Sequence, residues 1–286
     1  MSSNLTPSGI EKEQVVHDKE LTERHRRELE YHRGHTHEHE SLLQEPFDWD
    51  VVFSKSRRWW NGYWQMFDYF NTLDLKGKKV LIVGCGFGED AIRIARLGAN
   101  VYAFDLSPES LDIARKLSMR EQVQAQFAQM SAESLLYADN FFDVVLARDI
   151  LHHVDIPKAM NEITRVSKKN ALIIINELYS HSLTEKIRYS NLVTNSIYPA
   201  MRKFIYGTDT PYITEDERKL TEMDVAEIRK PLSDLVMQKY FSLIVTRVIP
   251  DRFITFAKID RVLLMLLKPL GMYFAGRVMF AGHLDK

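Results

Sequence analysis

Three glycines at alternate positions, Gly84, Gly86 and Gly88, follow an apolar run at 79–83 and precede a helical pattern. Because glycine has no Cβ, such a turn can bend tightly and let a ligand lie against bare backbone. Asp105 ends the next apolar run, 17 residues after Gly88. A carboxylate in that position can accept hydrogen bonds from both hydroxyls of a ribose. These residues predict a site for a nucleoside cofactor; the alternative is that the glycines only allow close packing of a helix on a strand.

The glycine spacing separates two classes of nucleoside cofactor. A dinucleotide fingerprint reads G-x-G-x-x-G/A, so that the pyrophosphate rests on a helix N-terminus. Here Glu89 stands three positions after Gly86, and Asp90 follows it. Two carboxylates at a helix start repel a pyrophosphate, but they are compatible with a cofactor that carries an ammonium and a sulfonium. The spacing therefore disfavours a nicotinamide-dependent oxidoreductase.

A strand followed by G-x-G-x-G resembles the first motif of the class I S-adenosylmethionine (SAM)-dependent methyltransferase family. The segment Leu151-His152-His153-Val154 is similar to the L-H-H-L segment of the small-molecule branch of that family. The resemblance covers residues 45–180 well and the rest loosely. The insertion at 178–232 resembles that of bacterial methyltransferases for glycolipids or natural products. The resemblance implies SAM as the cofactor.

The family pattern also implies which residues contact SAM. Four residues of the turn are implied to lie under its methionine part: Gly84, Cys85, Gly86 and Gly88. Asp105 is implied to accept the ribose hydroxyls, and Leu106 to lie against the adenine. Ser131 and Ala132 match a segment usually written D-A-E, but Ser131 replaces the acidic residue that often contacts the adenine amino group. Arg148 occupies the position that lines the methionine moiety.

Three residues are candidates for removing a proton from the acceptor. Methyl transfer is an in-line displacement, which requires the acceptor atom about 3–3.5 Å from the methyl carbon and a base where that atom carries a proton. His152 and His153 follow the fourth predicted strand, and Glu177 follows the fifth. Open α/β sheets bind ligands at this edge. By resemblance, His152 faces the acceptor and His153 braces the loop. The alternatives are a structural histidine pair and, for Glu177, a solvated strand end or an ion pair.

Aromatic residues gather before the first strand. All four tryptophans lie within 47–73, where three-and-four spacing predicts an amphipathic helix. An aromatic wall suits a planar or polyisoprenoid acceptor and could stabilise developing positive charge. Ordinary core packing is the alternative. Five aromatic residues are predicted to contact the acceptor: Trp59, Trp60, Tyr63, Tyr179 and Tyr198.

Beyond residue 76 the pattern alternates between strand and helix. Five strands are predicted, at Lys79–Val83, Val101–Phe104, Ala125–Ala128, Phe142–Ala147 and Ala171–Asn176. Ser107 is the predicted N-cap of the helix that follows the second of them. Closing strands are expected at 241–248 and 277–283. This order predicts an α/β fold with a doubly wound, mainly parallel, seven-stranded Rossmann-like sheet.

One domain with additions fits the chain better than two independent domains. The predicted segments are a polar, His-rich extension at 1–45, an aromatic helical lid at 46–75, a SAM-binding core at 76–177, a substrate cap at 178–240, and closing strands with an apolar helix at 241–286. The apolar run at 262–267 predicts a core helix under the final strands. Its cationic edges leave open a face that meets lipid or a hydrophobic acceptor.

Composition excludes several classes of protein. The 286 residues are 45% hydrophobic and carry a formal charge of −1, so no global positive field for nucleic acid exists. Cys85 is the single cysteine, which excludes an intrachain disulfide and favours a reducing, cytoplasmic compartment. Six of the ten histidines lie in 17–39, with His35, His37 and His39 at alternate positions; the segment is interpreted as solvated, and no metal site is predicted. No charge-free apolar run approaches ~18 residues, so contact with a membrane is peripheral at most. The sequence is compatible with a homo-oligomer.

Together these patterns predict a SAM-dependent methyltransferase for a small, hydrophobic acceptor, with O-methylation favoured over N- or C-methylation. Two alternatives stay open. One is a C-methyltransferase acting on an isoprenoid-type acceptor, in which Glu177 takes the final proton. The other is a SAM-binding protein that transfers no methyl group, such as a regulator or a rearrangement catalyst.

Overall fold

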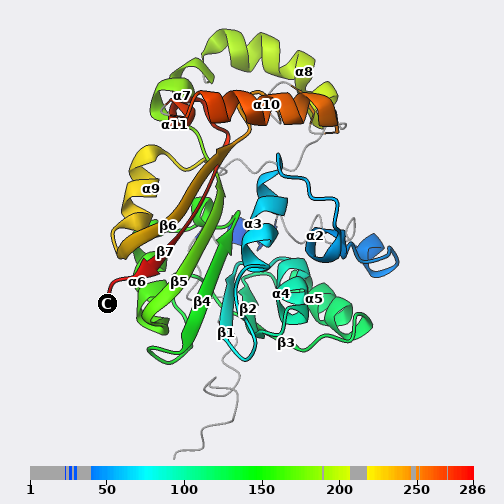
Figure 1. Ribbon diagram of the computed structural model, residues 1–286, viewed down its shortest axis with the longest axis vertical. Helices are drawn as coiled ribbons and strands as arrows, with labels where there is room; N and C mark the ends of the chain where they lie inside the picture. Colours follow the sequence, from blue (N-terminus) through cyan, green and yellow to red (C-terminus); the bar gives the residue numbers. More distant parts are fainter. Residues whose placement is uncertain are drawn as a thin grey trace, which may run out of the picture.

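The computed structural model describes residues 23, 26–27, 29–30, 40–188, 190–206, 218–245, 249–250, 252–268 and 270–286. Seven strands form one sheet in the order β3-β2-β1-β4-β5-β7-β6 (Figure 1). The strands are β1 (Lys79–Val83), β2 (Asn100–Asp105), β3 (Ala125–Gln129), β4 (Phe142–Arg148), β5 (Ser167–Leu178), β6 (Leu232–Phe241) and β7 (Arg277–Leu284). β1 to β5 are parallel, and β7 runs antiparallel to both β5 and β6. The predicted fold class is confirmed.

Helices cover both faces of this sheet. One face carries η1 (Glu40–Leu43), α2 (Asp50–Phe53), α3 (Gly62–Phe70), α4 (Glu89–Arg96) and α5 (Pro108–Arg120). The other face carries η2 (Leu151–His153), α6 (Ile156–Val166) and α9 (Glu222–Arg229). Alternate residues of each strand enter the two cores, as Leu81 and Ile82 do. Because both faces are buried, the central parallel strands β1, β4 and β5 contain continuous apolar runs.

The remaining helices lie beyond the carboxyl edge of the parallel strands. They are α7 (Ser182–Arg188), the π-helical turn η3 (Val193–Ile197), α8 (Tyr198–Tyr206), α10 (Ile254–Leu266) and α11 (Gly271–Phe274). Figure 1 shows α7, α8, α10 and α11 as a layer above the sheet. The predicted insertion after the fifth strand therefore supplies helices to the end of the sheet where ligands bind in open α/β folds.

Local signals fixed the boundaries of the parallel part well. The five predicted strands all lie within β1 to β5; the largest difference is at β5, which begins at Ser167 instead of Ala171. Ser107 is the N-cap of α5, as expected, because its hydroxyl accepts a hydrogen bond from the Ser110 N–H at 3.1 Å. The His-rich segment at 17–39 lies largely outside the described residues. The division of the chain into five functional segments stays a prediction.

The predicted strand at 241–248 is wrong. The sixth strand runs earlier, from Leu232 to Phe241, and lies next to β7. Its register shifts twice, between Leu232 and Asp234 and between Leu235 and Met237. Such bulges place two residues opposite one and break the alternation of apolar and polar side chains. The strand therefore lacks the period-two signal by which it could be recognised.

The prediction that 262–267 is a buried core helix is also wrong, because the segment is helical but mostly exposed. This segment ends α10, and only Ala257, Asp260 and Leu264 of the helix are buried. Leu266 is 76% exposed and Met265 is 55% exposed. The apolar side of the helix therefore faces outward. This leaves the other interpretation of 262–267, a face that meets lipid or a hydrophobic acceptor.

Candidate active site

The glycine turn between β1 and α4 leaves part of its backbone open. Gly84, Gly86 and Gly88 all have positive φ, at 60°, 50° and 81°. A Cβ on Gly84 would come within 2.4 Å of the Ile150 side chain, and one on Gly88 within 2.6 Å of the Ala114 Cβ. A Cβ on Gly86 would meet no atom of the described chain within 4 Å. Packing inside the protein therefore requires Gly84 and Gly88, whereas Gly86 borders space that a ligand can enter.

The Asp105 carboxylate lies against this turn. Its Oδ2 accepts a hydrogen bond from the Gly86 N–H at 2.8 Å, and its Oδ1 accepts one from the Ser107 N–H at 3.0 Å. The Cys85 N–H donates to the Phe104 carbonyl at 2.8 Å, which ties the turn to β2. A carboxylate offers about four acceptor positions, so Asp105 retains two for further donors. Asp105 thus both fixes the turn and can accept from a diol.

The residues predicted around the adenine lie at the same edge of the sheet. Asp105 pairs in register with Gln129, which brings the residues after β3 close to the end of β2. Leu106 and Ser131 are half-buried there, whereas Ala132 is 5% exposed and packs in the core. The structure therefore brings Leu106 and Ser131 to the Asp105 edge and places Ala132 behind it.

Arg148, the last residue of β4, forms an ion pair with Asp90 in the first turn of α4. Asp90 Oδ2 accepts from Arg148 Nε at 2.6 Å, and Asp90 Oδ1 accepts from the Tyr63 hydroxyl at 2.7 Å. Burial, followed by the Asp90 charge, raises the pKa of Tyr63 well above its usual value, so this phenol stays protonated. The sequence interpretation treated Asp90 as a charge facing a cationic cofactor. In the structure Arg148 neutralises that charge within the protein.

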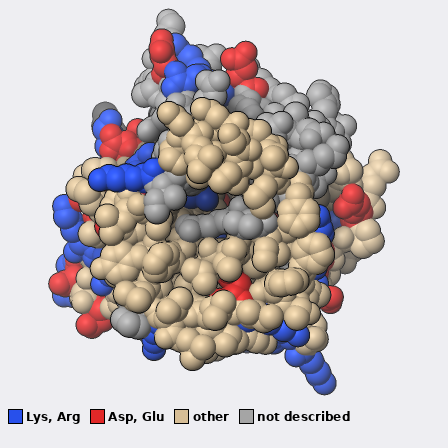
Figure 2. Space-filling view, turned by 90° about the horizontal axis from the view of Figure 1, so that it is seen from above, with Lys and Arg blue, Asp and Glu red and all other residues tan. Residues whose placement is uncertain are grey.

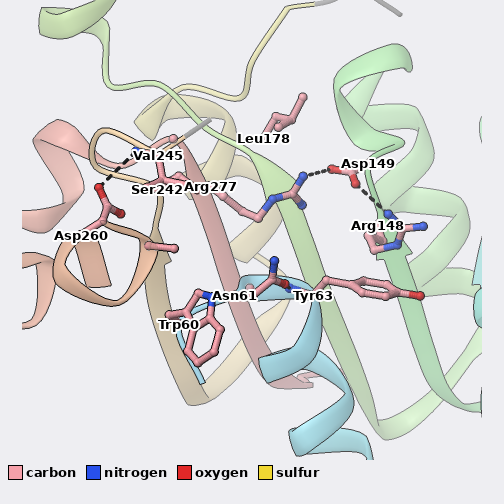
Figure 3. Close-up of a pocket in the computed structure, with 13 residues that line it drawn as sticks. Trp60, Asn61, Tyr63, Arg148, Asp149, Leu178, Ser242, Val245, Asp260 and Arg277 are labelled. Atoms are coloured by element: carbon pink, nitrogen blue, oxygen red, sulfur yellow. Dashed lines mark hydrogen bonds and ion pairs between the residues drawn. The ribbon is translucent and has the colours of Figure 1, made fainter. Parts of the chain in front are cut away.

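A cavity of about 260 Å³ lies between the start of α3, α10 and the ends of β4, β5 and β7. Two of the five predicted aromatic residues, Trp60 and Tyr63, line it. The polar residues of its wall are Asn61, Arg148, Asp149, Ser242, Asp260 and Arg277. Figure 3 shows the Arg148 and Arg277 guanidiniums on either side of Asp149. Because Tyr63 and Arg148 also contact Asp90 on α4, the cavity adjoins the helix that follows the glycine turn.

The other three predicted aromatic residues are not among the residues that line this cavity. Trp59 is 39% exposed and packs edge-on against Trp60, with ring centroids 5.9 Å apart. Tyr179 is buried in the core, 5.6 Å from the Tyr240 ring. Tyr198 begins α8 and is half-buried. The aromatic wall of the cavity therefore comes from the start of α3 and the residues just before it.

Sequence reasoning missed Asp149 and Arg277. Asp149 Oδ1 lies 2.8 Å from Arg277 Nη2, and Asp149 Oδ2 accepts from Arg148 Nη1 at 2.9 Å. Asp149 has a φ of 53°, a conformation that non-glycine residues adopt mostly at turns and functional sites. A signal for both did exist. Asp149 directly follows a parallel strand, and β7 begins with Arg277 at the same edge because it pairs antiparallel with β5.

Replacing Asp149 with Asn is expected to lower the free energy of unfolding near neutral pH by about 1–3 kcal/mol, the usual range for a partner lost by a charged group. Asn tolerates positive φ as Asp does, so the change removes charge without new backbone strain. Burial raises the pKa of Asp149, but the Arg277 and Arg148 charges outweigh it and leave the pKa lowered. A carboxyl group whose pKa is lower in the folded than in the unfolded state stabilises the protein fully at pH values above its unfolded-state pKa. This stabilisation is lost as the pH falls through its folded-state pKa.

Urea unfolding of the wild-type protein and of Asp149→Asn, from about pH 7 down to about pH 3, checks this prediction. The free energies of unfolding of the two proteins should converge as Asp149 of the wild type is protonated. A difference that stays constant across this range would contradict the assigned ion pairs.

Glu177 and His152 form a buried pair. Glu177 is 0% exposed and His152 is 4% exposed. Glu177 Oε1 accepts from the Ile150 and Leu151 N–H groups at 2.8 and 2.7 Å, and its Oε2 lies 2.7 Å from His152 Nδ1. The carboxylate therefore has three donors and is not a solvated strand end. Its contact with Nδ1 favours the tautomer in which that nitrogen carries the proton.

His153 lies beside this pair but has a different environment. The His152 and His153 rings are 4.1 Å apart, and His153 is half-buried. The backbone N–H of His153 donates to the carbonyl of Ile150, the N-cap of η2, at 2.9 Å. The Glu177 carboxylate thus contacts the ring of His152, and this contact distinguishes the two histidines by geometry.

Comparison with known proteins identifies the type of domain that contains these residues. Residues 81–175 match the family described as a methyltransferase domain. Residues 81–175 of this chain therefore form a methyltransferase domain. The ubiquinone biosynthesis O-methyltransferase of Xanthomonas oryzae pv. oryzae (strain PXO99A) is 36% identical over 123 residues, which are 39% of this chain and 52% of that protein. The chain thus spans about half the length of the curated relatives it matches.

Solved structures share the fold of this methyltransferase domain. The [4+2]-cyclase SpnF aligns with a TM-score of 0.56 and 16% identity, over 90% of this chain and 94% of that one. Phosphoethanolamine N-methyltransferase 2 of Haemonchus contortus aligns with a TM-score of 0.51 and 20% identity, over 78% of this chain and 52% of that one. At these identities the likeness concerns the fold alone.

SAM is the cofactor of the family, and the residues of this methyltransferase domain fit it. The open space at Gly86 admits a ligand to the turn, and Asp105 retains acceptor positions for the ribose hydroxyls. Leu106 and Ser131 lie at the adenine end, and Arg148 lies where the turn meets the cavity. When bound, SAM supplies a methyl group on a sulfonium, which is an electrophile.

Proposed function

We propose that this protein is a SAM-dependent O-methyltransferase whose acceptor is a small, hydrophobic phenol or catechol. The observation that carries the proposal is the cavity that shares Tyr63 and Arg148 with the start of α4, directly after the glycine turn. An acceptor in this cavity would lie next to the methionine end of the cofactor. The name of the Xanthomonas relative, an O-methyltransferase, supports oxygen as the methylated atom. The Haemonchus structure holds S-adenosylhomocysteine, which supports the cofactor.

The cavity wall favours an oxygen acceptor on a ring. Trp60 and Tyr63 offer flat apolar surfaces for an aromatic ring. Asn61 and Arg277 offer N–H donors that suit a hydroxyl losing its proton. Methylation at carbon of an isoprenoid develops positive charge, which N–H donors do not stabilise. Methylation at carbon of an isoprenoid-type acceptor is therefore less well supported than methylation of a phenol.

Proton removal is assigned to His152, with Glu177 as the positioning residue. Glu177 holds Nδ1 as the protonated nitrogen, which leaves Nε2 with the basic lone pair. Glu177 is fully buried and accepts from three donors, so it is poorly suited to take the proton itself. His152 is not among the residues that line the cavity; it lies in η2, three residues after Asp149, which does line it. His153 would brace the loop.

Two neighbouring tryptophans provide a matched test of where the acceptor binds. Trp60→Ala is expected to raise the KM for the acceptor by about tenfold or more, because a ring in the cavity loses its stacking surface. Trp59→Ala removes an equally large side chain that does not line the cavity, and it should leave KM near the wild-type value. SAM affinity, measured by calorimetry, should change in neither variant.

The assay uses the purified full chain with SAM and a panel of alkyl-substituted phenols and catechols. Mass spectrometry should show an O-methyl product in equal amount to S-adenosylhomocysteine. Tight SAM binding with no methyl loss for any acceptor would contradict the proposal and favour a SAM-binding protein that transfers no methyl group. Product at carbon would favour the isoprenoid-type alternative.

A further inference from the structure

α10 has an inverted arrangement for a helix in contact with water. Its buried positions, Ala257, Asp260 and Leu264, present little apolar surface to the protein. Its large apolar side chains point outward, with Leu266 76% exposed and Met265 55% exposed. A helix on the surface of a globular protein normally does the opposite. An exposed apolar area of this kind marks a binding surface.

The exposed apolar surface continues beyond the helix. Phe253, just before α10, is 41% exposed, and Leu270, just after it, is 47% exposed. Phe204 of α8 stacks on Phe253, with ring centroids 6.2 Å apart, and is 48% exposed. We call the exposed apolar residues of 253–270 together with Phe204 the outer apolar face. Figure 2 looks down on this end of the molecule and shows an area without charged residues, with Lys and Arg next to it on the left and Asp and Glu farther out.

The exposed charges of the segment that carries most of the outer apolar face have one sign. Among the described residues of 252–268, the exposed charged side chains are Arg252, Lys258 and Lys268. The one acidic residue in that part of the chain, Asp260, is buried and accepts hydrogen bonds from the N–H groups of 243–245. An apolar helix face with a cationic margin is typical of helices that lie in the surface of an anionic membrane. Two copies of the chain meeting through this face would bring like charges together, which disfavours a dimer.

The same helix forms part of the cavity wall. Ala257 and Asp260 line the cavity from one side of α10. Lys258 lies over the Trp60 ring, 4.8 Å from its centroid, and Trp60 also lines the cavity. α10 therefore separates the acceptor cavity from the outer apolar face by the thickness of one helix. An apolar acceptor dissolved in a membrane would need to travel only a short path to reach the cavity.

We propose that the outer apolar face docks on the surface of an anionic lipid membrane and that the acceptor is drawn from that membrane. The second half of this inference rests on the proposed function; the first half does not. In the described part of the chain, no helix is long and apolar enough to cross a membrane. Docking would therefore place α10 parallel to the lipid surface, with its apolar side chains among the acyl chains and Lys268 at the headgroups.

Flotation of the full chain with vesicles tests the docking. One set of vesicles is phosphatidylcholine alone, and the other contains about one quarter phosphatidylglycerol, which supplies the negative surface potential. We expect binding to the anionic vesicles that weakens with added salt. The double variant Met265→Gln, Leu266→Gln should reduce the bound fraction severalfold, and Lys268→Glu should reduce it as well. Met119→Gln on α5 is the matched control, because Met119 is 74% exposed but lies on a different surface.

Three results would overturn the docking: no binding to either vesicle, equal loss of binding in the Met119 control, or a dimer in light scattering that the α10 double variant makes monomeric. The last result would assign the face to a second copy. Methylation of a water-soluble phenol without vesicles separates this test from that of the proposed function. The α10 variants should keep that activity, so loss of docking with activity retained contradicts only the present inference.

Discussion

Replacing Gly86 with alanine is expected to weaken SAM binding by roughly tenfold or more, about 1.4 kcal/mol. The reason is that a methyl group would enter the open space beside the turn, where SAM must approach the backbone. Strain from the positive φ adds a cost to folding of about 1–2 kcal/mol, so affinity has to be separated from stability. Calorimetric titration of the folded variant with SAM gives the affinity directly.

Gly77 provides the matched control for this variant. Its φ is 72°, and a Cβ on Gly77 also meets nothing within 4 Å in the described chain. It lies before β1, away from the carboxyl edge of the sheet. Gly77→Ala should therefore lose as much stability as Gly86→Ala and bind SAM like the wild-type protein. Equal SAM affinity in the two variants would show that the cofactor does not lie against the turn at Gly86.

Replacing Glu177 with glutamine is expected to lower kcat by roughly 10²–10⁴-fold, the usual contribution of a general base. The Gln oxygen can still accept from the Ile150 and Leu151 N–H groups, which preserves the loop. Its amide nitrogen would then face His152 Nδ1 and donate to it. The imidazole must take the other tautomer, with the proton on Nε2, and that nitrogen can no longer accept a proton.

Several readouts separate this effect from a structural one. The melting temperature and the SAM affinity of Glu177→Gln should stay close to those of the wild-type protein, because the amide has the size of the carboxylate. His152→Gln should lower kcat by a similar factor, and the double variant should be little worse than either single one, since the two residues act as a unit. His153→Gln is the control and should retain most activity. Wild-type kcat in Glu177→Gln would exclude His152 as the base.

The cofactor half of the site was largely predictable because its signals are local. The three glycines, the strand before them and Asp105 lie within 79–105, and their conformations follow from short-range sterics and strand pairing. The family pattern placed Leu106 and Ser131 at the same edge of the sheet, and the register of β2 with β3 agrees with that placement. Ala132 followed the pattern in sequence, but its side chain turned into the core.

The acceptor half was much less predictable. Trp60 and Trp59 are neighbours of the same type, yet only the first lines the cavity. Tyr179 was expected in the pocket and is instead buried against the Tyr240 ring. Residue type showed that these side chains could bind a ring. It did not show which way each one points, because that depends on the packing of α3, β6 and β7 around them.

The sequence by itself determined the strands and helices of the parallel part of the sheet, the glycine turn, and the position of Asp105 at the end of β2. Each of these depends on residues that are close in the chain. Only the tertiary structure paired Asp149 with Arg277 and Glu177 with His152, and only it turned the apolar side of α10 outward. Those contacts join segments far apart in sequence. They are set by the antiparallel return of β7 beside β5 and by the burial of charged groups, which require a partner when they leave water.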